Sequence, residues 1–185
     1  MPGRIQMKRC AWCNEKNPVY LEYHDHEWGK PRFDDDYLLE MLILESFQAG
    51  LSWECVLNKR ENFRRAFDGF DRAKIMAYDA EKQESLAQDK GIIRNRRKIK
   101  AAVENAVVFD AIVCEYGSFY AYLKQFWNGE IISECGFTHS VLSDCISKDL
   151  IRRGMKFVGT TIIYSYLQAV GIVNSHEKIC FLHQE

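Results

Sequence analysis

Cysteine and histidine residues gather near both ends of the chain, where they could hold a metal ion. His176 and Cys180 are four residues apart, so one helical turn would place both side chains on one face. The other end offers Cys10, Cys13, His24 and His26. A Cys2His2 zinc site would tie the two ends together. The spacing is not that of a zinc finger, and Cys10-Ala-Trp-Cys13 also matches the redox motif C-x-x-C, so the residues alone leave the ligand set open.

A carboxylate stands near the end of a strongly apolar segment. The residues one helical turn before Glu45 are apolar, so in a helix Glu45 points along an apolar face. Glu40 lies about 140° around the helix and would not share that face. A carboxylate in such a setting is either paired or functional. The alternative is a helix-end glutamate that reaches solvent. The short loop from Gln48 to Leu51 that follows could present Leu51 outward.

Four aromatic residues lie in the N-terminal segment, which is the part least able to form regular structure. They are Trp12, Tyr20, Tyr23 and Trp28. Their rings could wall a stacking pocket for a flat ligand such as a base. The alternative is an irregular lid whose Trp and Tyr side chains anchor it on a helical core.

A basic segment from Lys90 to Lys100 contains six basic residues and no acidic ones. Its sequence predicts a tight turn at Gly91 between two helices, with Asn95 as the cap of the second, which is typical of a helix-hairpin-helix element. Free N–H groups at the second helix, together with Arg94 and Arg97, would hold a phosphate backbone without reading sequence. A solvated basic helix face is the alternative.

The composition limits the kind of protein that these residues can serve. The chain has 185 residues, 47% of them hydrophobic, and 25 Lys+Arg nearly balance 26 Asp+Glu. This balance argues against a disordered chain and against coating of nucleic acid by bulk charge. No stretch predicts a membrane helix, and the polar start lacks the apolar core of a signal peptide, so we expect a cytosolic protein with reduced cysteines.

The elements that must position these residues are predicted to be helices. All three prolines fall within the first 31 residues, so an irregular N-terminus followed by an all-α bundle is expected. The predicted helices cover 34–50, 53–67, a short one from 71, 81–89, 95–114, 116–126, 143–153, 158–170 and 175–181. Four isolated cysteines are expected in the core: Cys55, Cys114, Cys135 and Cys145.

Taken together, these segments resemble the bacterial 3-methyladenine DNA glycosylases of the constitutive type. The similar stretches lie in order over nearly the whole chain. They are Arg9-Cys-Ala-Trp12, Tyr20-Leu-Glu-Tyr-His-Asp-His-Glu-Trp-Gly29, Leu44-Glu45, Gln48-Ala-Gly-Leu-Ser-Trp53, Leu57 to Asn62, Gly91-Ile-Ile-Arg94, Arg153-Gly-Met-Lys-Phe-Val-Gly-Thr-Thr161 and His176 to Cys180. The resemblance implies an all-α helix-hairpin-helix glycosylase in one unit, residues 1–185, with residues 1–33 and 172–185 as a zinc-linked terminal subdomain.

The resemblance also assigns roles to individual residues. Cys10, His24, His176 and Cys180 fall on the ligands of one structural zinc ion, although Cys13 is an extra thiol beside them. Glu45 falls on the base-recognition carboxylate and Trp53 on the ring that stacks with the flipped base. The other pocket aromatics are Tyr23, Trp12, Tyr20 and Trp28. Leu51 and its neighbours, Gln48 among them, fall on the loop that enters the DNA stack, while Gly91, Arg94 and Arg97 belong to the DNA-binding hairpin.

The implied reaction is hydrolysis of the N-glycosidic bond of 3-methyladenine in double-stranded DNA, without strand cleavage, by a monomer in the bacterial cytosol. Methylation makes this base a good leaving group, so strong acid catalysis is unnecessary. Asp110 lies 19 residues after Gly91, where other helix-hairpin-helix glycosylases carry an aspartate, but it is interpreted here as a helix-surface residue. The alternatives are a non-catalytic DNA-binding module with a structural zinc, and a small thiol or zinc-storage protein built around the seven cysteines.

Overall fold

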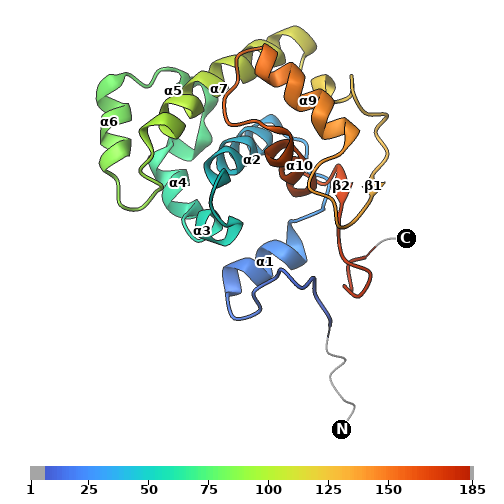
Figure 1. Cartoon of the computed structure of the whole chain (residues 1–185). Helices are drawn as coiled ribbons and strands as arrows, with labels where there is room; N and C mark the ends of the chain where they lie inside the picture. Colours follow the sequence, from blue (N-terminus) through green and yellow to red (C-terminus); the bar gives the residue numbers. More distant parts are fainter. Residues whose placement is uncertain (1–6, 184–185) are drawn as a thin grey trace.

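The computed structural model describes residues 7–183 and shows a mostly helical chain (Figure 1). The described helices are α1 (Pro18–His26), α2 (Asp35–Gln48), α3 (Trp53–Leu57), α4 (Arg60–Ala66), α5 (Arg72–Met76), α6 (Ala80–Gln88), α7 (Arg96–Tyr116), α8 (Phe119–Leu123), α9 (Val141–Arg152) and α10 (Thr160–Ala169), with a 3-10 turn η1 (Asp68–Phe70) and two strands, β1 (Ile132–Ser133) and β2 (Val173–Asn174). The predicted all-α class is therefore confirmed. Residues 1–6 and 184–185, which the expected terminal subdomain includes, lie outside the described range.

Helix α2 forms the centre of the fold. Its N-terminus is capped by Asp34, whose side chain accepts a hydrogen bond from the Tyr37 N–H. Every residue from Tyr37 to Phe47 is buried, because α7 and α10 both pack against the helix (Figure 1). A helix that is apolar nearly all round has to be enclosed in this way. Polar side chains between Tyr37 and Phe47 are consequently buried wherever they point.

The N-terminal segment is not irregular as predicted, because residues Pro18–His26 form α1. Asn17 caps this helix through its side chain, and Pro18 occupies the first helical position, where a missing N–H has no cost. The proline that suggested irregular structure therefore begins a helix. In Figure 1, α1 lies below the other helices, and it packs against α3.

Several helix boundaries also differ from those predicted. The helix expected over 53–67 is interrupted between Leu57 and Arg60, so that α3 and α4 are separate. Helix α9 starts earlier than expected, because Ser140 rather than Ser143 caps it and the two serines form a reciprocal capping box. The helix expected over 175–181 is absent; these residues lie in turns that follow β2.

The cysteines distribute differently from the prediction. Cys114, Cys135 and Cys145 are exposed and Cys55 is only partly buried, so the expectation that these four are core residues is wrong. A thiol contributes too little apolar area to force its segment inward, and the larger neighbours decide which face is buried. The buried cysteines among the described residues are Cys10, Cys13 and Cys180, all in the terminal segments.

Two long-range connections bring distant segments to one end of the molecule. Strands β1 and β2 pair in parallel, with Ile132 opposite Val173. The Phe181 N–H donates to the Lys8 carbonyl at 2.9 Å, so the two terminal segments run side by side. The segment after β1 and the segment after β2 are thereby placed next to α1 and the end of α2. Among the described residues, no helix is long and apolar enough to cross a membrane.

Candidate active site and metal centre

A cavity of about 310 Å³ opens where α1, α2, α3 and α10 meet the segments that follow β1 and β2. The side chains that line it come from seven separate stretches of the chain. They are Trp12, Tyr20, Tyr23, Trp28, Glu45, Gln48, Trp53, Cys135, Gly136, Phe137, Ser165, Gln168, Ser175 and Glu177. The structure thus brings all six predicted pocket residues, and Gln48, to one cavity.

Glu45 is the only carboxylate that α2 contributes to this cavity. It is 2% exposed, and its Oε2 atom has no hydrogen-bond partner among the described residues. Burial raises the pKa of Glu45 well above its usual range, because water no longer solvates the charged form. An unpaired buried carboxyl group at a cavity wall can accept a hydrogen bond from a ligand when it is ionised, or donate one to a ligand when it is protonated.

Aromatic rings form most of the remaining wall. The rings of Tyr23 and Trp53 lie 5.4 Å apart at 50°, and those of Trp12 and Trp28 lie 4.7 Å apart nearly edge to face. These geometries pack the rings against one another, and all four rings line the cavity. The indole Nε1 of Trp53 and the Oε1 of Gln48 are, like Glu45, buried without a partner. Three unpartnered polar atoms therefore belong to one cavity.

Sequence reasoning missed the second half of the wall. Cys135, Gly136 and Phe137 reach the cavity because β1 pairs with β2, and Ser165 and Gln168 reach it from α10. The motif from Arg153 to Thr161 ends before Ser165 and Gln168, and nothing in the local sequence marks these two residues as part of a pocket. Phe137 is the most exposed of the apolar side chains in this set, at 60%.

The loop between α2 and α3 lies at the edge of the same cavity. The Leu51 N–H donates to the Gln48 carbonyl at 2.6 Å, and Gly50 has a φ of 78°, a conformation that favours glycine. Leu51 is 43% exposed, as predicted from the short loop. The tight turn thus presents an apolar side chain to solvent beside the pocket.

The four residues assigned as metal ligands meet in one buried cluster. Their ligand atoms all lie within 4.8 Å of one another. Cys180 Sγ is 3.6 Å from His24 Nε2 and 3.5 Å from His176 Nδ1, and Cys10 Sγ is also 3.5 Å from His176 Nδ1. Tetrahedral zinc bonds of about 2.3 Å to sulfur and 2.0–2.1 Å to nitrogen place neighbouring ligand atoms about 3.6 Å apart. The four side chains therefore fit a zinc ion.

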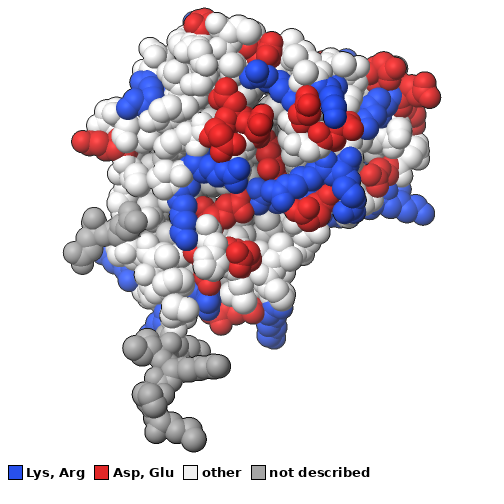
Figure 2. All heavy atoms as spheres, turned by 180° about the vertical axis from the view of Figure 1, so that it is seen from behind, with Lys and Arg blue, Asp and Glu red and all other residues white. Residues whose placement is uncertain are grey.

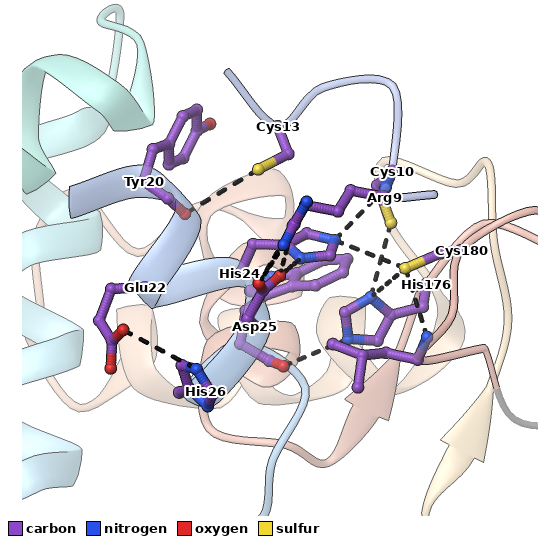
Figure 3. A network of polar contacts seen from close by, with 12 residues as sticks. Arg9, Cys10, Cys13, Tyr20, Glu22, His24, Asp25, His26, His176 and Cys180 are labelled. Carbon is purple, nitrogen blue, oxygen red and sulfur yellow. Dashed lines mark hydrogen bonds and ion pairs between the residues drawn. The ribbon is translucent and has the colours of Figure 1, made fainter. Parts of the chain in front are cut away.

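The surroundings of the cluster hold its side chains in the orientation of metal ligands (Figure 3). His24 Nδ1 contacts Asp25 Oδ1 at 2.7 Å, which turns Nε2 toward the sulfur atoms, and Arg9 in turn grips Asp25. Burial lowers the pKa of His176 to about 4, so its ring is neutral, as a ligand must be. Burial raises the pKa of the Cys10 thiol to about 12, and a bound cation would offset this by stabilising the thiolate.

The remaining candidate ligands point elsewhere. Cys13 lies beside the Tyr20 carbonyl, with Sγ 4.0 Å from the oxygen, and is not part of the cluster. His26 is exposed and contacts Glu22 on the outer face of α1 (Figure 3). Of the alternatives that the sequence left open, the geometry therefore favours Cys10 and His24.

The basic segment is less uniformly exposed than its composition suggested. Lys98 is buried, Arg96 forms an ion pair with Glu84 of α6, and Lys100 forms one with Glu104 at 3.7 Å. The expectation of six uncompensated, exposed basic residues is therefore wrong for these three. Lys90, Arg94 and Arg97 form no ion pair that the structure resolves among the described residues. Figure 2 shows basic and acidic side chains interspersed on the face opposite Figure 1, as expected for a nearly neutral chain.

The turn between α6 and α7 is held by close packing. Ile92 is buried beneath it, and the Asn62 amide donates to the Gly91 carbonyl at 3.0 Å. A Cβ atom on Gly91 would lie 3.0 Å from Asp89 Oδ1 and 3.3 Å from Asn62, so the residue is small because of a close approach and not because of a positive φ. Asn95 caps α7 as predicted. Asp110 pairs with Arg72 at 3.1 Å and does not line the cavity.

Comparisons with known proteins agree with this arrangement. The family model for methyladenine glycosylase matches residues 12–183. The chain is 45% identical to DNA-3-methyladenine glycosylase 1 of Escherichia coli strain K12, covering 94% of this chain and 96% of that protein. It is 39% identical to the DNA-3-methyladenine glycosylase of Haemophilus influenzae, covering 93% and 96%.

A solved structure gives the same result at the level of the fold. The structure of 3-methyladenine DNA glycosylase I from Staphylococcus aureus, solved to explain its recognition of 3-methyladenine, matches with a TM-score of 0.90 at 34% identity, covering 97% of this chain and 98% of that one. The family match over residues 12–183 covers every residue that lines the cavity and, of the Cys/His cluster, His24, His176 and Cys180. The chain belongs to the methyladenine glycosylase family.

Proposed function

We propose that this protein is a DNA-3-methyladenine glycosylase that hydrolyses the N-glycosidic bond of 3-methyladenine in alkylated double-stranded DNA. The observation that carries the proposal is Glu45, a buried carboxyl group without a partner, facing a cavity walled by aromatic rings. The relatives' names supply the substrate. The reaction begins base-excision repair and leaves the DNA strand intact.

The cavity suits a flipped, methylated adenine for three reasons. The rings of Trp53 and Tyr23 offer faces on which a base can stack, which contributes on the order of 1–3 kcal/mol. Glu45 can accept a hydrogen bond from the exocyclic amino group of adenine. The methylated base is also cationic, so its entry favours the ionised form of Glu45 and lowers the pKa that burial has raised.

Glu45 acts in this scheme by selecting and holding the base. Its attraction to the cationic base weakens as the base departs neutral, so this attraction by itself does not lower the barrier. The methylated base already leaves readily, and water attacks the oxocarbenium-like sugar. The chain's part is therefore to extract the nucleotide from the stack, bind the damaged base selectively and exclude undamaged ones.

Two elements are assigned to DNA contact, the turn between α6 and α7 and the Gln48–Leu51 loop. We infer that Arg94 and Arg97, together with the backbone around Gly91, hold the phosphate backbone as a helix-hairpin-helix element would. Leu51, exposed on the tight Gln48–Leu51 turn, fills the space left in the stack by the flipped nucleotide. No groove contact that would read base sequence is required.

A structural zinc ion is part of the proposal. Cys10, His24, His176 and Cys180 would hold it, and four protein ligands leave no open position for water. The ion would join residues 1–33 to 172–185 as a terminal subdomain and fix α1, which carries Tyr20 and Tyr23 of the pocket wall. We further propose that the protein acts as a monomer in the bacterial cytosol.

Base release from methylated duplex DNA tests the function directly. Purified protein should liberate free 3-methyladenine, resolved from other methylated bases by chromatography, and the DNA should remain unbroken until abasic sites are cleaved by alkali. Protein that binds the duplex but releases no base would instead identify the non-catalytic DNA-binding module. Several weakly bound zinc ions per chain, instead of one tight ion, would favour a storage protein.

A further inference from the structure

Lys98 is a buried lysine that the proposed DNA contacts do not use. It lies in the first turn of α7, yet it is only 6% exposed. Its Nζ atom donates to the Phe47 carbonyl at 2.8 Å and to the Ala49 carbonyl at 2.6 Å. Both acceptors belong to the end of α2, which carries Glu45 and continues into the Gln48–Leu51 loop. The basic hairpin is thus bonded directly to this loop.

The two hydrogen bonds satisfy a helix end that would otherwise be unpaired. The last carbonyl groups of a helix have no partner within it and carry partial negative charge, which a cation stabilises. Lys98 takes the carbonyls of Phe47 and Ala49, while the Leu51 N–H takes that of Gln48. Three consecutive carbonyls at the start of the loop are therefore fixed, two of them by one side chain from another helix.

The ammonium group of Lys98 also contacts an aromatic ring. Its Nζ atom lies 5.8 Å from the centre of the Phe157 ring, within the range of a cation–π contact. Phe157 has a φ of 55°, which a bulky residue adopts only where its surroundings enforce it. Asn105, fully buried on α7, provides that enforcement, because its side chain accepts from the Lys156 N–H at 2.8 Å and donates to the Lys156 carbonyl at 2.9 Å.

We propose that Lys98 is a positioning residue that locks the Gln48–Leu51 loop to the basic hairpin, so that the side chain inserted into DNA and the phosphate-binding turn act as one rigid unit. The proposal rests on the proposed function of the loop and hairpin in binding DNA. It also gives a role to the Gly154–Gly159 segment of the family motif, which supplies Phe157 and does not line the cavity.

The hydrogen bonds of Lys98 would fix the position of the Gln48–Leu51 loop relative to the basic hairpin. Arg94 lies just before α7, and Arg97 lies in its first turn, next to Lys98 in the sequence. Leu51 lies two residues after Ala49, whose carbonyl Lys98 binds. Once the hairpin holds the phosphate backbone, the loop has a fixed position relative to the duplex. Lys98 acts through the loop and touches neither the base nor the sugar.

Hydrogen exchange tests the lock without reference to activity. Lys98→Met keeps most of the side-chain volume and removes the donors, whereas Lys148→Met removes an exposed lysine of α9 as the matched control. Amide exchange in residues 48–52 should quicken at least about tenfold in Lys98→Met, because tenfold is the factor expected for loss of one typical hydrogen bond and this variant loses two. It should not change in Lys148→Met, nor in the first half of α2 in either variant. Unchanged exchange at 48–52 would overturn the proposal.

Single-turnover base release tests whether the hydrogen bonds of Lys98 help the protein to flip the damaged nucleotide out of the DNA stack. At saturating duplex DNA, Lys98→Met should release 3-methyladenine about tenfold more slowly than the wild type, while free 3-methyladenine binds both proteins equally. In a Leu51→Ala background the same substitution should add little further loss, because the side chain that the lock positions is already gone. Additive losses, or weaker binding of the free base, would contradict the proposal.

The two proposals fail in different ways. If the wild-type protein releases no 3-methyladenine, the proposed function is wrong, and the exchange comparison still decides whether Lys98 fixes the loop. Should Lys98→Met not fold, Lys98→Gln retains a neutral side-chain NH2 donor group and gives the same comparisons with a smaller effect. A wild-type exchange pattern in Lys98→Gln combined with slower release would assign that loss to something other than the lock.

Discussion

Two glutamates on α2 lie five residues apart and are both buried, but their surroundings are opposite. Glu40 accepts from Arg60 Nε at 2.7 Å and from Arg64 Nε at 2.9 Å. Arg60 in turn bonds Glu27 at 2.7 Å, so this side of the helix is a closed ion-pair network. Glu45, on the other side, has an oxygen atom with no partner among the described residues and faces the cavity.

The difference shows how burial alone fails to separate structural from functional charge. The two arginines beside Glu40 offset the free-energy cost of removing its carboxylate from water. Glu45 has no such partner, so a bound ligand would have to offset this cost. Burial raises the pKa of Glu45, and no positive charge among the described residues lowers it. We therefore expect substitutions on the Glu40 side to affect stability, and substitutions on the Glu45 side to affect base recognition.

The Cys/His cluster extends the comparison to a third buried polar site and predicts the largest effect on stability. Cys180→Ser should release zinc and lower the free energy of unfolding by several kcal/mol. The four ligands come together only in the folded chain, so the free energy of metal binding stabilises the folded state. Metal content and thermal unfolding measure this. Cys13→Ser is the matched control and should keep one zinc ion per chain. A Cys180→Ser protein with stoichiometric zinc would contradict the assigned ligands.

Glu45→Gln is the direct test of the cavity side. It preserves shape but removes the charge and adds an NH2 donor facing the adenine amino group. We expect 3-methyladenine release to fall about a hundredfold, in line with loss of a hydrogen bond to a charged group. Zinc content, folding and affinity for undamaged DNA should stay near those of the wild type. Release at the wild-type rate would show that Glu45 does not bind the base.

Glu40→Gln is the matched substitution on the paired side. It should lower the free energy of unfolding by about 2 kcal/mol, less than the 3–5 kcal/mol of breaking a buried pair outright, because the amide oxygen can still accept from an arginine. Base release by the folded protein should remain within about twofold of wild type, well below the effect of losing a charged hydrogen bond. Chemical denaturation and the same release assay measure both. A large loss of activity with unchanged stability would remove the contrast between the two glutamates.

Exposed charges provide a third case, in which neither stability nor the pocket is expected to change. Arg94→Ala combined with Arg97→Ala should weaken binding to all duplex sequences alike by about tenfold. The slope of log affinity against log salt should flatten by about 1.8 for two phosphate contacts. Binding measured over a range of salt concentrations tests this. An altered sequence preference with an unchanged salt slope would mean that these arginines contact bases.

The smallest effect expected is a pH dependence of stability caused by Glu45. An acid whose pKa is higher in the folded than in the unfolded chain adds stability below the unfolded value, and this is lost as pH rises through the folded value. Glu45→Gln should therefore be more stable than wild type at about pH 7.5, with a difference that shrinks as the pH falls toward the unfolded glutamate value of about 4.3. Thermal unfolding of both proteins across this range measures it, with Glu81→Gln as an exposed control. A difference that grows on acidification would show that Glu45 is not destabilised by burial.

Local signals in the sequence were sufficient for much of the helical framework. Asp34 and Asn95 cap the helices that were predicted from them, since a capping side chain bonds to N–H groups only two or three residues away. The turn at Gly50 and the exposure of Leu51 follow from equally local chemistry. The ordered motifs also pointed to the family that the comparisons show.

Only the tertiary structure decided which polar groups are paired. The local sequence does not show that Glu40 is paired and Glu45 is not, because the arginines that pair with Glu40 lie 20 and 24 residues away. Lys98 looked like one more exposed cation until α7 was packed on the end of α2. Cys10 lies in the metal cluster and Cys13 does not. This difference depends on the contact between Cys10 and His176, which are 166 residues apart in the sequence. Helix formation depends on neighbours in sequence, whereas pairing of a buried charge depends on neighbours in space, and that is why the sequence indicated the elements while folding selected the site.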